Sequence, residues 1–560
     1  MQQRSDRTDS TGHTTHHVPV LIVGGSLVGL STSVFLGRLG VRHTLVERHA
    51  GTSIHPRGRG NNVRTMELYR AAGVEPGIRK AAATLAGNHG ILQTPTLVGD
   101  AGGWLFKEID AGGGLARFSP SSWCLCSQND LEPVLFEHAE RLGCDLRYGT
   151  ELLSFDSDPS GVTAVAKSRE TGEHTTFRAD YLVAADGPRS PVREQLDIGQ
   201  SGPGDLFHNV SVTFRSRGLA DVVGDRRFIV CYLTNPDADG ALLPVDNREN
   251  WVFHAPWHPE QGETLEDFTE ERCAEHIRRA VGVADLDVQV TGKAPWHAAQ
   301  RVARSYRSGR VFLAGDSAHE MSPTGAFGSN TGIQDAHNLA WKLAAVLGGW
   351  AGAGLLDTYD AERRPVAEAT SARAASRSVE HSHPGFAPAP GVGGGAGPQR
   401  DILNVALGYR YPQGAVLGTD PAAPVVPERL DLSGEPGSRA PHMAVRHRGE
   451  PISTLDLYER SLVLLSDADA DADGPGGWHE AALRLAEAMP VPLTSYRVGT
   501  GPDAELTPEG DADWATVHGT TPSGAVLVRP DGFVAWRSSG PVPDAESALR
   551  DVLTTLLATV

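Results

Sequence analysis

The sequence predicts an α/β protein in which a dinucleotide-binding domain is interrupted by a β-sheet domain and followed by a smaller α/β domain. Three observations support this fold class. An apolar run ends in a glycine-rich turn at 24–29, strand-like segments dominate about 196–300, and a buried-strand pattern returns at 310–313. A chain of 560 residues is too long for one core, so about three or four domains are expected.

We expect domain boundaries where the composition or the periodicity changes. The first residues are polar and contain no apolar segment of a secretion signal, and a Pro/Gly-rich stretch follows the helix-rich part of the chain. The predicted parts are a disordered leader (1–17), a discontinuous nucleotide-binding domain (18–195 and 301–382), a substrate-binding sheet domain (196–300), a linker (383–400) and a C-terminal domain (401–560).

Composition excludes several classes of function. A formal net charge of −19 disfavours binding to nucleic-acid phosphates, which relies on Lys and Arg. The chain has no run of about 18 apolar residues, so we expect no membrane span and a soluble cytoplasmic protein. No C-x-x-C pair occurs, so neither a metal site nor a dithiol is predicted from the cysteines Cys124, Cys126, Cys144, Cys231 and Cys273.

The first β-α-β unit carries an altered nucleotide fingerprint. We expect strands over 18–23 and 41–47 and a helix over 30–39. Gly24 and Gly29 are the first and last glycines of a G-x-G-x-x-G pattern, with Gly25 beside the first, but Ser26 replaces the middle glycine. Serine is small and its hydroxyl can donate to a phosphate oxygen, so we interpret the turn as a working pyrophosphate site.

An acidic residue follows the second strand at the position where a ribose diol needs an acceptor. Glu47 lies near the usual spacing of roughly 20 residues after the first glycine. Its carboxylate would repel a 2′-phosphate, which favours FAD or NAD over NADP at this position. Arg48, the next residue, is a further cofactor-binding candidate.

Two later strands deliver polar residues to their carboxyl ends. Residues 181–185 form a buried strand before D-G-x-x-S-x-x-R, in which Asp186 and Gly187 turn the chain while Ser190 and Arg193 secure the next helical turn. Residues 310–313 form another strand, and a glycine-rich loop then leads to a helix N-terminus. The candidates there are Gly315, Asp316, Pro323, Gly328, Ser329 and Asn330. Either cluster alone could be an ordinary strand-end turn.

Together, the three clusters resemble the class A flavoprotein monooxygenases of the p-hydroxybenzoate hydroxylase type over about 18–380. The resemblance implies an FAD-binding Rossmann-like domain of the GR2 type with non-covalent FAD. It places the ADP half at Gly24, Gly25, Gly29 and Glu47, the ribityl chain at Asp316 and the flavin ring at 323–330. It also implies that Asp186 serves both FAD and the nicotinamide cofactor, and that Arg57 and Gln128 contact FAD.

The tail narrows the resemblance to a subgroup. Residues 525–537 resemble the thioredoxin-like appendage of phenol hydroxylases and of bacterial hydroxylases that tailor aromatic polyketides. All five cysteines precede this domain, so it cannot perform dithiol chemistry, and we expect a packing role or a homodimer contact. The resemblance implies hydroxylation of a polycyclic phenol or quinone through a flavin C4a-hydroperoxide, with O2 and transiently bound NADPH or NADH.

Other readings of the same residues stay open. The scaffold also fits a Baeyer–Villiger oxygen insertion or a flavin-binding protein without turnover, whereas the W-x-W-x-I-P segment typical of flavin halogenases has no good counterpart. Tyr232, His254 and His297 could act as a base toward a phenol, but such residues are more often packing residues. No catalytic residue is assigned from the sequence.

Overall fold

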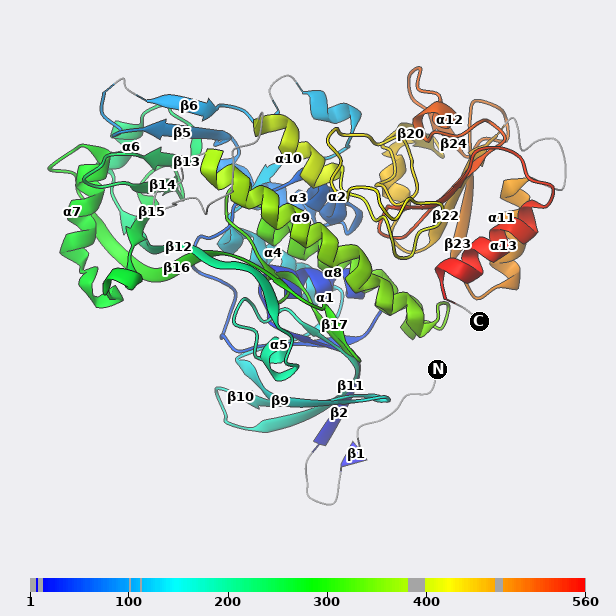
Figure 1. The fold of residues 1–560 in the computed structure, drawn as a ribbon, viewed down its shortest axis with the longest axis horizontal. Helices are drawn as coiled ribbons and strands as arrows, with labels where there is room; N and C mark the ends of the chain where they lie inside the picture. The colour runs from blue at the N-terminus through cyan, green and yellow to red at the C-terminus, as the bar shows by residue number, and fades with distance from the viewer. Residues whose placement is uncertain are drawn as a thin grey trace.

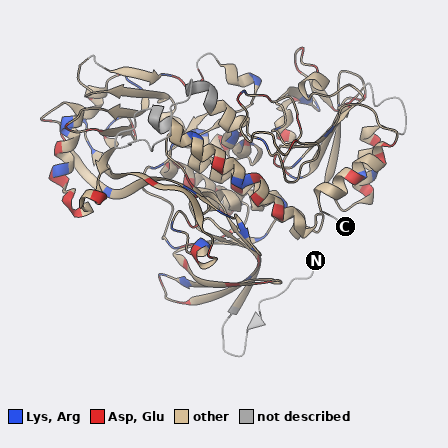
Figure 2. Cartoon of the chain, viewed as in Figure 1, with Lys and Arg blue, Asp and Glu red and all other residues tan. Residues whose placement is uncertain are grey.

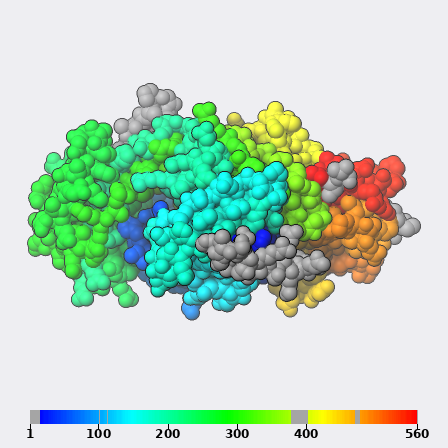
Figure 3. Space-filling view, turned by 90° about the horizontal axis from the view of Figure 1, so that it is seen from below, coloured from blue at the N-terminus to red at the C-terminus, as the bar shows by residue number. Residues whose placement is uncertain are grey.

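The structure is a computed structural model that describes residues 7–8, 14–99, 102–110, 113–380, 398–468 and 477–558. These residues form three large sheets of nine, eight and seven strands. The molecule is elongated, with the eight-stranded sheet at one end, the seven-stranded sheet at the other and the nine-stranded sheet between them (Figures 1 and 3). Within the described ranges, no helix combines the length and hydropathy that a membrane-spanning segment needs.

The nine-stranded sheet contains the predicted nucleotide-binding unit. Its central strands run parallel in the order β18-β11-β2-β3-β8, with β17 antiparallel at one edge. β10 pairs with β11, and β9 pairs with β10. The strands are β1 (Arg7–Thr8), β2 (Thr14–Val23), β3 (His43–Glu47), β8 (Asp145–Tyr148), β9 (Thr150–Asp158), β10 (Gly161–Ser168), β11 (His174–Ala184), β17 (Arg307–Ser308) and β18 (Val311–Leu313).

Helices and a small two-stranded sheet surround these strands. α1 packs against α4 and α8, and its apolar residues share one core with β2 and β3. The helices are α1 (Leu27–Arg38), α2 (Val63–Ala71), α3 (Glu75–Ala81), α4 (Gln128–Arg141), α5 (Pro191–Gln195), α8 (Phe327–Leu347) and α9 (Thr358–Glu380). The small sheet pairs β4 (Gly60–Asn61) with β7 (Cys124–Leu125).

The first strand begins earlier than the sequence indicates. Thr15 pairs with Thr176 of β11, so residues 14–17 of the expected leader belong to β2. The polar side chains of residues 14–17 do not indicate a strand, because β-bridges are formed by backbone groups, which any sequence supplies. Upstream, β1 (Arg7–Thr8) pairs with β2, and the rest of the predicted leader lies outside the described residues.

The eight-stranded sheet draws on more of the chain than 196–300. Its order is β19-β16-β12-β15-β14-β13-β5-β6, so three strands come from segments assigned to the other domain. The boundaries predicted for the sheet domain were therefore too narrow. The strands are β5 (Gly90–Thr94), β6 (Gly103–Phe106), β12 (Gln200–Arg215), β13 (Phe228–Leu233), β14 (Gly240–Pro244), β15 (Asn250–Trp257), β16 (Gln289–Ala303) and β19 (His319–Glu320).

One face of this sheet is closed by α6 (Gly218–Val223) and α7 (Glu270–Val281). Val210, Val212 and Phe253 from the sheet pack with Leu219 and Ile277 from the two helices in one apolar core. Acidic and basic residues are interspersed along the outer side of α7 (Figure 2). This sheet therefore leaves its opposite face available to the rest of the molecule.

The C-terminal domain has the predicted α/β character. β22, α11 and β23 form a parallel β-α-β unit, and a β25-β26 hairpin followed by α13 completes a thioredoxin-like arrangement. The strands are β20 (Ala444–His447), β21 (Glu450–Ser453), β22 (Leu462–Asp467), β23 (Leu493–Val498), β24 (Leu506–Pro508), β25 (Ala525–Val528) and β26 (Val534–Ser538). The helices are α11 (Trp478–Ala488), α12 (Trp514–Val517) and α13 (Ala545–Leu556).

The predicted linker over 383–400 falls mostly on residues 383–397, which lie outside the described ones. Helix α10 (Pro398–Leu407) begins before the expected end of that linker, with proline at its first position, where a missing N–H costs nothing. The division into a discontinuous nucleotide-binding domain, a sheet domain and a C-terminal domain stays our proposal, with the bounds of the first strand and of the second sheet revised as above.

Candidate active site

The glycine turn after β2 is built by close backbone contacts. Gly24 has φ +106°, and its N–H donates to the carbonyl of Val46 at 2.9 Å. A Cβ atom on Gly29 would lie 1.8 Å from the carbonyl oxygen of Gly24, so only glycine lets α1 approach the strand this closely. Ser26 occupies the N-cap of α1 and its side chain is exposed.

Glu47 and Gly25 connect the ends of β2 and β3. The Gly25 N–H donates to Oε2 of Glu47 at 2.6 Å, and the His49 N–H donates to Oε1 at 2.8 Å. A Cβ atom on Gly25 would lie 2.7 Å from the Glu47 Cβ. The carboxylate is thus fixed at the strand end, where the fingerprint requires it, and Arg48 next to it is exposed.

The Ser26 hydroxyl has partners within the protein. It donates to Oε1 of Glu132 at 2.6 Å and accepts from Nε2 of Gln128 at 2.8 Å. Oε2 of Glu132 accepts from the Ser53 N–H at 2.7 Å. Sequence reasoning selected Gln128 but missed Glu132, although their i,i+4 spacing in QNDLE places both on one face of α4.

The D-G motif forms the turn that the sequence predicts. Ser190 caps α5 by accepting from the Arg193 N–H at 3.0 Å, and the Arg193 guanidinium donates to the carbonyls of Ser317 (2.9 Å) and Pro188 (3.0 Å). Arg193 therefore joins this motif to the Gly315–Ser317 segment. Burial raises the pKa of Asp186, and its Oδ1 is buried without a hydrogen-bond partner among the described residues.

Asp316 lies directly after β18, in the short 3-10 helix Gly315–Ser317. The residue is exposed to solvent, yet many protein atoms surround its carboxyl group. Burial raises the pKa of Asp316, and electrostatic interactions with His319, Arg57 and His297 oppose that rise. These interactions indicate that Arg57 and His297 lie around the same space as Asp316.

The loop into α8 contacts the segment that carries Arg57. The Asn330 side chain accepts from the Asn62 N–H at 2.9 Å and donates to the Gly60 carbonyl at 2.7 Å, so it fixes the backbone of that segment. A Cβ atom on Gly58 would lie 3.7 Å from the Ser329 Oγ, whereas one on Gly328 would meet nothing within 4 Å. Pro323 accepts from the Ala326 N–H at 2.9 Å in the turn before the helix. Arg57 is exposed.

A buried carboxylate behind this loop was also missed. Oδ2 of Asp335 accepts from Nε2 of His319 at 2.8 Å and from the Gly315 N–H at 3.2 Å. Its Oδ1 accepts from Nε of Arg363 at 2.8 Å. The sequence offered one signal for Asp335, an acidic residue about two turns into the helix that follows the loop. Its partner Arg363 on α9, however, is distant in the sequence.

These groups fit an extended dinucleotide with a diol and a pyrophosphate. Glu47 ends β3, while Asp186 and Asp316 follow β11 and β18. The carboxyl ends of these strands share one edge of the sheet. Added Cβ atoms at Gly187 and Gly328 would meet nothing within 4 Å, so the backbone there is open to close approach. The unpartnered Oδ1 of Asp186 and the accessible carboxylate of Asp316 supply acceptors for hydroxyl groups.

The second sheet turns a mixed aromatic and polar face away from α7. Its register brings residues of six neighbouring strands into one row across this face: Gln93, Tyr232, Ala241, His254, Ser211 and Ala294. Ser211 contacts the nucleotide-binding domain through His55, whose Nε2 lies 2.9 Å from the Ser211 Oγ. The row therefore faces that domain.

Two neighbours add to this row, which we call the polar row. The rings of His254 and Trp296 stack with their centroids 5.2 Å apart. Asn209, opposite Trp296, is 1% exposed, and its Nδ2 has no partner within the described structure. Flat rings beside a few fixed polar groups are typical of sites for small aromatic ligands.

Comparisons with known proteins agree with this geometry. Residues 17–374 match the family model described as FAD binding domain, and residues 433–559 match the model described as aromatic-ring hydroxylase, C-terminal. The chain belongs to the FAD-dependent aromatic-ring hydroxylases. The resemblance read from the three motifs is thereby confirmed: the protein is a flavin-dependent monooxygenase, FAD is its cofactor, and NAD(P)H is the reductant typical of the family.

Individual relatives match over nearly the whole chain. The chain is 79% identical over 554 residues to "Putative polyketide hydroxylase" of Streptomyces halstedii, with 99% of each chain covered. It is 42% identical to the tetracenomycin A2 monooxygenase-dioxygenase of Streptomyces glaucescens, over 97% of each. The crystal structure of aklavinone-11 hydroxylase with FAD and aklavinone is similar at TM-score 0.87 and 38% identity, over 97% of this chain and 99% of that chain.

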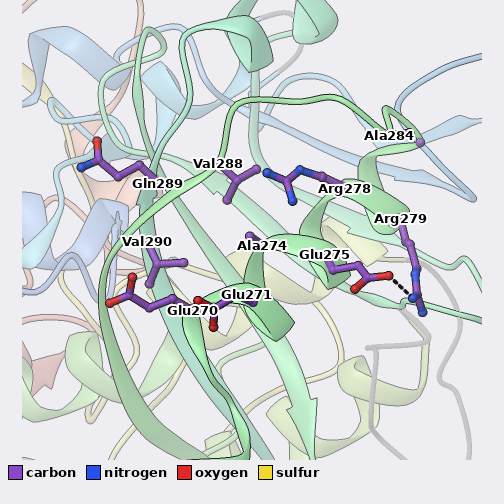
Figure 4. Close-up of a pocket in the computed structure, with 11 residues that line it drawn as sticks. Glu270, Glu271, Ala274, Glu275, Arg278, Arg279, Ala284, Val288, Gln289 and Val290 are labelled. Atoms are coloured by element: carbon purple, nitrogen blue, oxygen red, sulfur yellow. Dashed lines mark hydrogen bonds and ion pairs between the residues drawn. The ribbon is translucent and has the colours of Figure 1, made fainter.

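A large surface hollow of this hydroxylase lies elsewhere. It measures about 820 Å³ and is lined by α7 and the start of β16, including Glu271, Arg278 and Gln289 (Figure 4). Because α7 covers the face of the second sheet opposite the polar row, the hollow is separated from the FAD motifs by the sheet itself. Its lining offers charged side chains on a solvent-exposed helix and no link to the flavin site.

Proposed function

We propose that this enzyme hydroxylates a polycyclic aromatic polyketide, a phenol or a quinone, at a site between the FAD domain and the polar row of the second sheet. The observation that carries the proposal is the row itself, which presents Tyr232, His254 and Ser211 on one face turned toward the FAD domain. The polyketide enzymes among the relatives support the substrate class.

The FAD contacts in this proposal are those that the motifs suggest. Gly24, Gly25, Ser26 and Gly29, with Gln128 nearby, hold the pyrophosphate, while Glu47 accepts from the adenosine ribose. Asp316 accepts from the ribityl chain, and Asp186 and Arg57 line the path of the cofactor. Gly187, Arg193 and Asn330 act through the backbone that they shape, since the bonds of both side chains go to main-chain atoms.

When bound, FAD supplies the redox chemistry that activates O2 with electrons from NADPH or NADH. The protein binds and orients the substrate and excludes water. The side chains around the polar row suit these tasks: Trp296 offers an aromatic surface, and the buried Nδ2 of Asn209 offers a donor to a carbonyl or hydroxyl oxygen.

A charged pair flanks this site. Nε2 of His297 lies 3.2 Å from Oε1 of Glu320, whose Oε2 accepts from Arg301 at 2.9 Å. The hydrogen bond to Glu320 raises the pKa of His297, so the imidazolium is favoured there. We therefore assign His297 to donating a hydrogen bond or holding charge and not to acting as a base.

The decisive experiment is mass spectrometry of products formed from candidate polycyclic phenols and quinones under heavy-isotope-labelled O2. One labelled oxygen as a new hydroxyl group supports the proposal. A labelled ester or lactone would indicate Baeyer–Villiger insertion, and reductant consumption without labelled product from any such substrate would contradict the substrate class. Mixtures lacking NADPH and NADH serve as the control. The preferred nicotinamide cofactor, a homodimer and a cytoplasmic location stay predictions.

A further inference from the structure

The hairpin turn of the C-terminal domain is inserted into the FAD domain as a buried charged group. Arg529, at the end of β25, donates from Nη1 and Nη2 to the two carboxylate oxygens of Glu362 on α9, at 2.7 and 2.8 Å. Its Nε donates to Oδ1 of Asp531 at 3.0 Å. The side chains of Arg529 and Glu362 are 1% and 0% exposed, so this pair is fully shielded from water.

The network continues from this turn toward the segment 314–326 between β18 and α8, which we call the cofactor loop. Nδ2 of Asn338 on α8 donates to Oδ2 of Asp531 at 3.2 Å and lies 3.4 Å from the Tyr411 hydroxyl. That hydroxyl accepts from Nη1 of Arg363 at 3.2 Å. Arg363 in turn donates to Asp335, the carboxylate that holds His319 and the Gly315 N–H.

Helix α9 connects the turn of the C-terminal domain to the cofactor loop through two adjacent residues. Glu362 binds the C-terminal turn, while Arg363 binds Asp335 behind the cofactor loop, and both side chains are fully buried. Lys342 of α8 also binds Glu362, with Nζ 2.7 Å from Oε2. Because Glu362 and Arg363 are joined by one peptide bond, the position of either residue constrains that of the other.

The same turn also reaches the other side of the FAD site. Arg64 of α2 donates to the carbonyl of Asp531, and Arg439 binds Glu67 of the same helix. Helix α2 follows directly after Asn62, the residue whose N–H is bound by Asn330 at the start of α8. Helices α2 and α9, on two sides of the cofactor loop, are thus both bonded to the C-terminal domain.

A buried charged network adds little stability if its only role is to hold two domains together. Burying paired charges often stabilises no more than apolar residues of the same volume, whereas it fixes geometry through directional hydrogen bonds. Chains of buried hydrogen bonds also couple their members more strongly than isolated pairs do. The arrangement therefore favours a role in setting geometry at its far end.

We propose that the C-terminal domain positions the cofactor loop. Arg529 and Asp531 are positioning residues. They act on Gly315 and Asp316 through a chain of four side chains: Asn338, Tyr411, Arg363 and Asp335. The domain then contributes to FAD affinity although it has no cysteine and no dithiol chemistry. This inference rests on the proposed assignment of Asp316 to FAD.

The test measures FAD affinity of the full chain by flavin fluorescence, beside thermal unfolding of the apoprotein. Asp531→Asn removes the charge opposite Arg529, and Tyr411→Phe removes one hydroxyl from the middle of the path without leaving a buried charge. We expect the Kd for FAD to rise about tenfold in the first and about threefold in the second. Glu459→Gln, which breaks the interdomain pair with Arg38 outside the path, should stay within about twofold of the parent protein.

The outcomes separate a positioning role from adhesion. Unchanged FAD affinity in Tyr411→Phe, or equal losses in Asp531→Asn and Glu459→Gln, would overturn the inference. Effects of Asp531→Asn and Tyr411→Phe that fall short of additivity in the double variant would support one shared path. If Asp531→Asn does not fold, Tyr411→Phe decides alone. Asp316→Ala distinguishes the two levels: unchanged FAD affinity there refutes the loop assignment, and not merely its coupling to the C-terminal domain.

Discussion

Ser26 donates a hydrogen bond to Glu132, with 2.6 Å between the hydroxyl and carboxylate oxygens. The serine stands where the nucleotide fingerprint normally has its middle glycine, and the glutamate comes from α4, far along the chain. The hydroxyl that we expected to face a phosphate is thus already paired with the protein. Serine is tolerated in this tight turn partly because a neighbouring helix provides an acceptor.

This relationship leads to a test with two substitutions at one position. Ser26→Gly restores the usual fingerprint, so FAD affinity should change by less than about threefold, because only the two partly exposed hydrogen bonds to Glu132 and Gln128 are lost. Ser26→Val adds bulk and a branched side chain at the closest approach, and we expect FAD affinity to fall by at least about tenfold. Flavin fluorescence titration measures both. Equal affinities in the two variants would show that the turn does not touch the pyrophosphate.

Asp316 provides a second test of the cofactor site. Asp316→Ala removes an accessible acceptor at the end of β18, and we expect the Kd for FAD to rise by at least about tenfold, since hydrogen bonds to charged groups contribute roughly 1.5–3 kcal/mol. Retained flavin after gel filtration and a titration of the apoprotein measure this effect. Asp156→Ala, an exposed carboxylate on β9, is the matched control and should bind FAD as the parent protein does.

The polar row predicts a separation of substrate effects from cofactor effects. Tyr232→Phe removes one hydroxyl from this face, so we expect kcat/KM for the aromatic substrate to fall by about tenfold while FAD affinity is unchanged. Steady-state kinetics and flavin titration on the same preparation check this. Tyr496→Phe on β23 of the C-terminal domain is the control. A parallel loss of FAD affinity in Tyr232→Phe would argue that the row supports the fold and does not bind substrate.

The His297–Glu320 pair predicts a pH dependence. The bond to Glu320 raises the pKa of His297 above its ordinary 6.5, so its stabilisation is complete below that pH and disappears as the pH rises through the higher folded-state value. Burial opposes ionisation of Glu320, but His297 and Arg301 lower its pKa below the ordinary 4.5, so its stabilisation is present above that pH and is lost as the pH falls through the lower folded-state value.

The pair should therefore stabilise the protein most between these two ordinary values. We expect His297→Gln to lower Tm more at about pH 5.5 than at about pH 8.5. Thermal unfolding of the variant and parent protein at both pH values measures this. A Tm difference that is the same at both pH values would contradict the ion pair. Glu320→Gln removes the same pair, so it should also lower Tm more at about pH 5.5 than at about pH 8.5.

Local sequence predicted the first β-α-β unit well, because its signals lie within a few residues of each other. The strand expected over 18–23 lies within β2, and Ser190 caps α5 as its spacing indicated. The expected start of the first helix, at 30, was late: α1 begins at Leu27, and Ser26 occupies the N-cap position without a side-chain capping hydrogen bond. The second sheet was only partly foreseen, since β5 joins β13 across more than a hundred residues.

The sequence by itself determined the family, the cofactor and the carboxylates at three strand ends, because each of those signals is a short motif whose residues must adopt one local geometry. Only the tertiary structure decided which residues meet across long separations. Glu132 at Ser26, Asp335 behind Gly315 and Arg529 on Glu362 come from different elements, and their pairing depends on how helices pack around the sheets. Burial, which no motif encodes, makes those pairings obligatory, because a charge removed from water needs a partner.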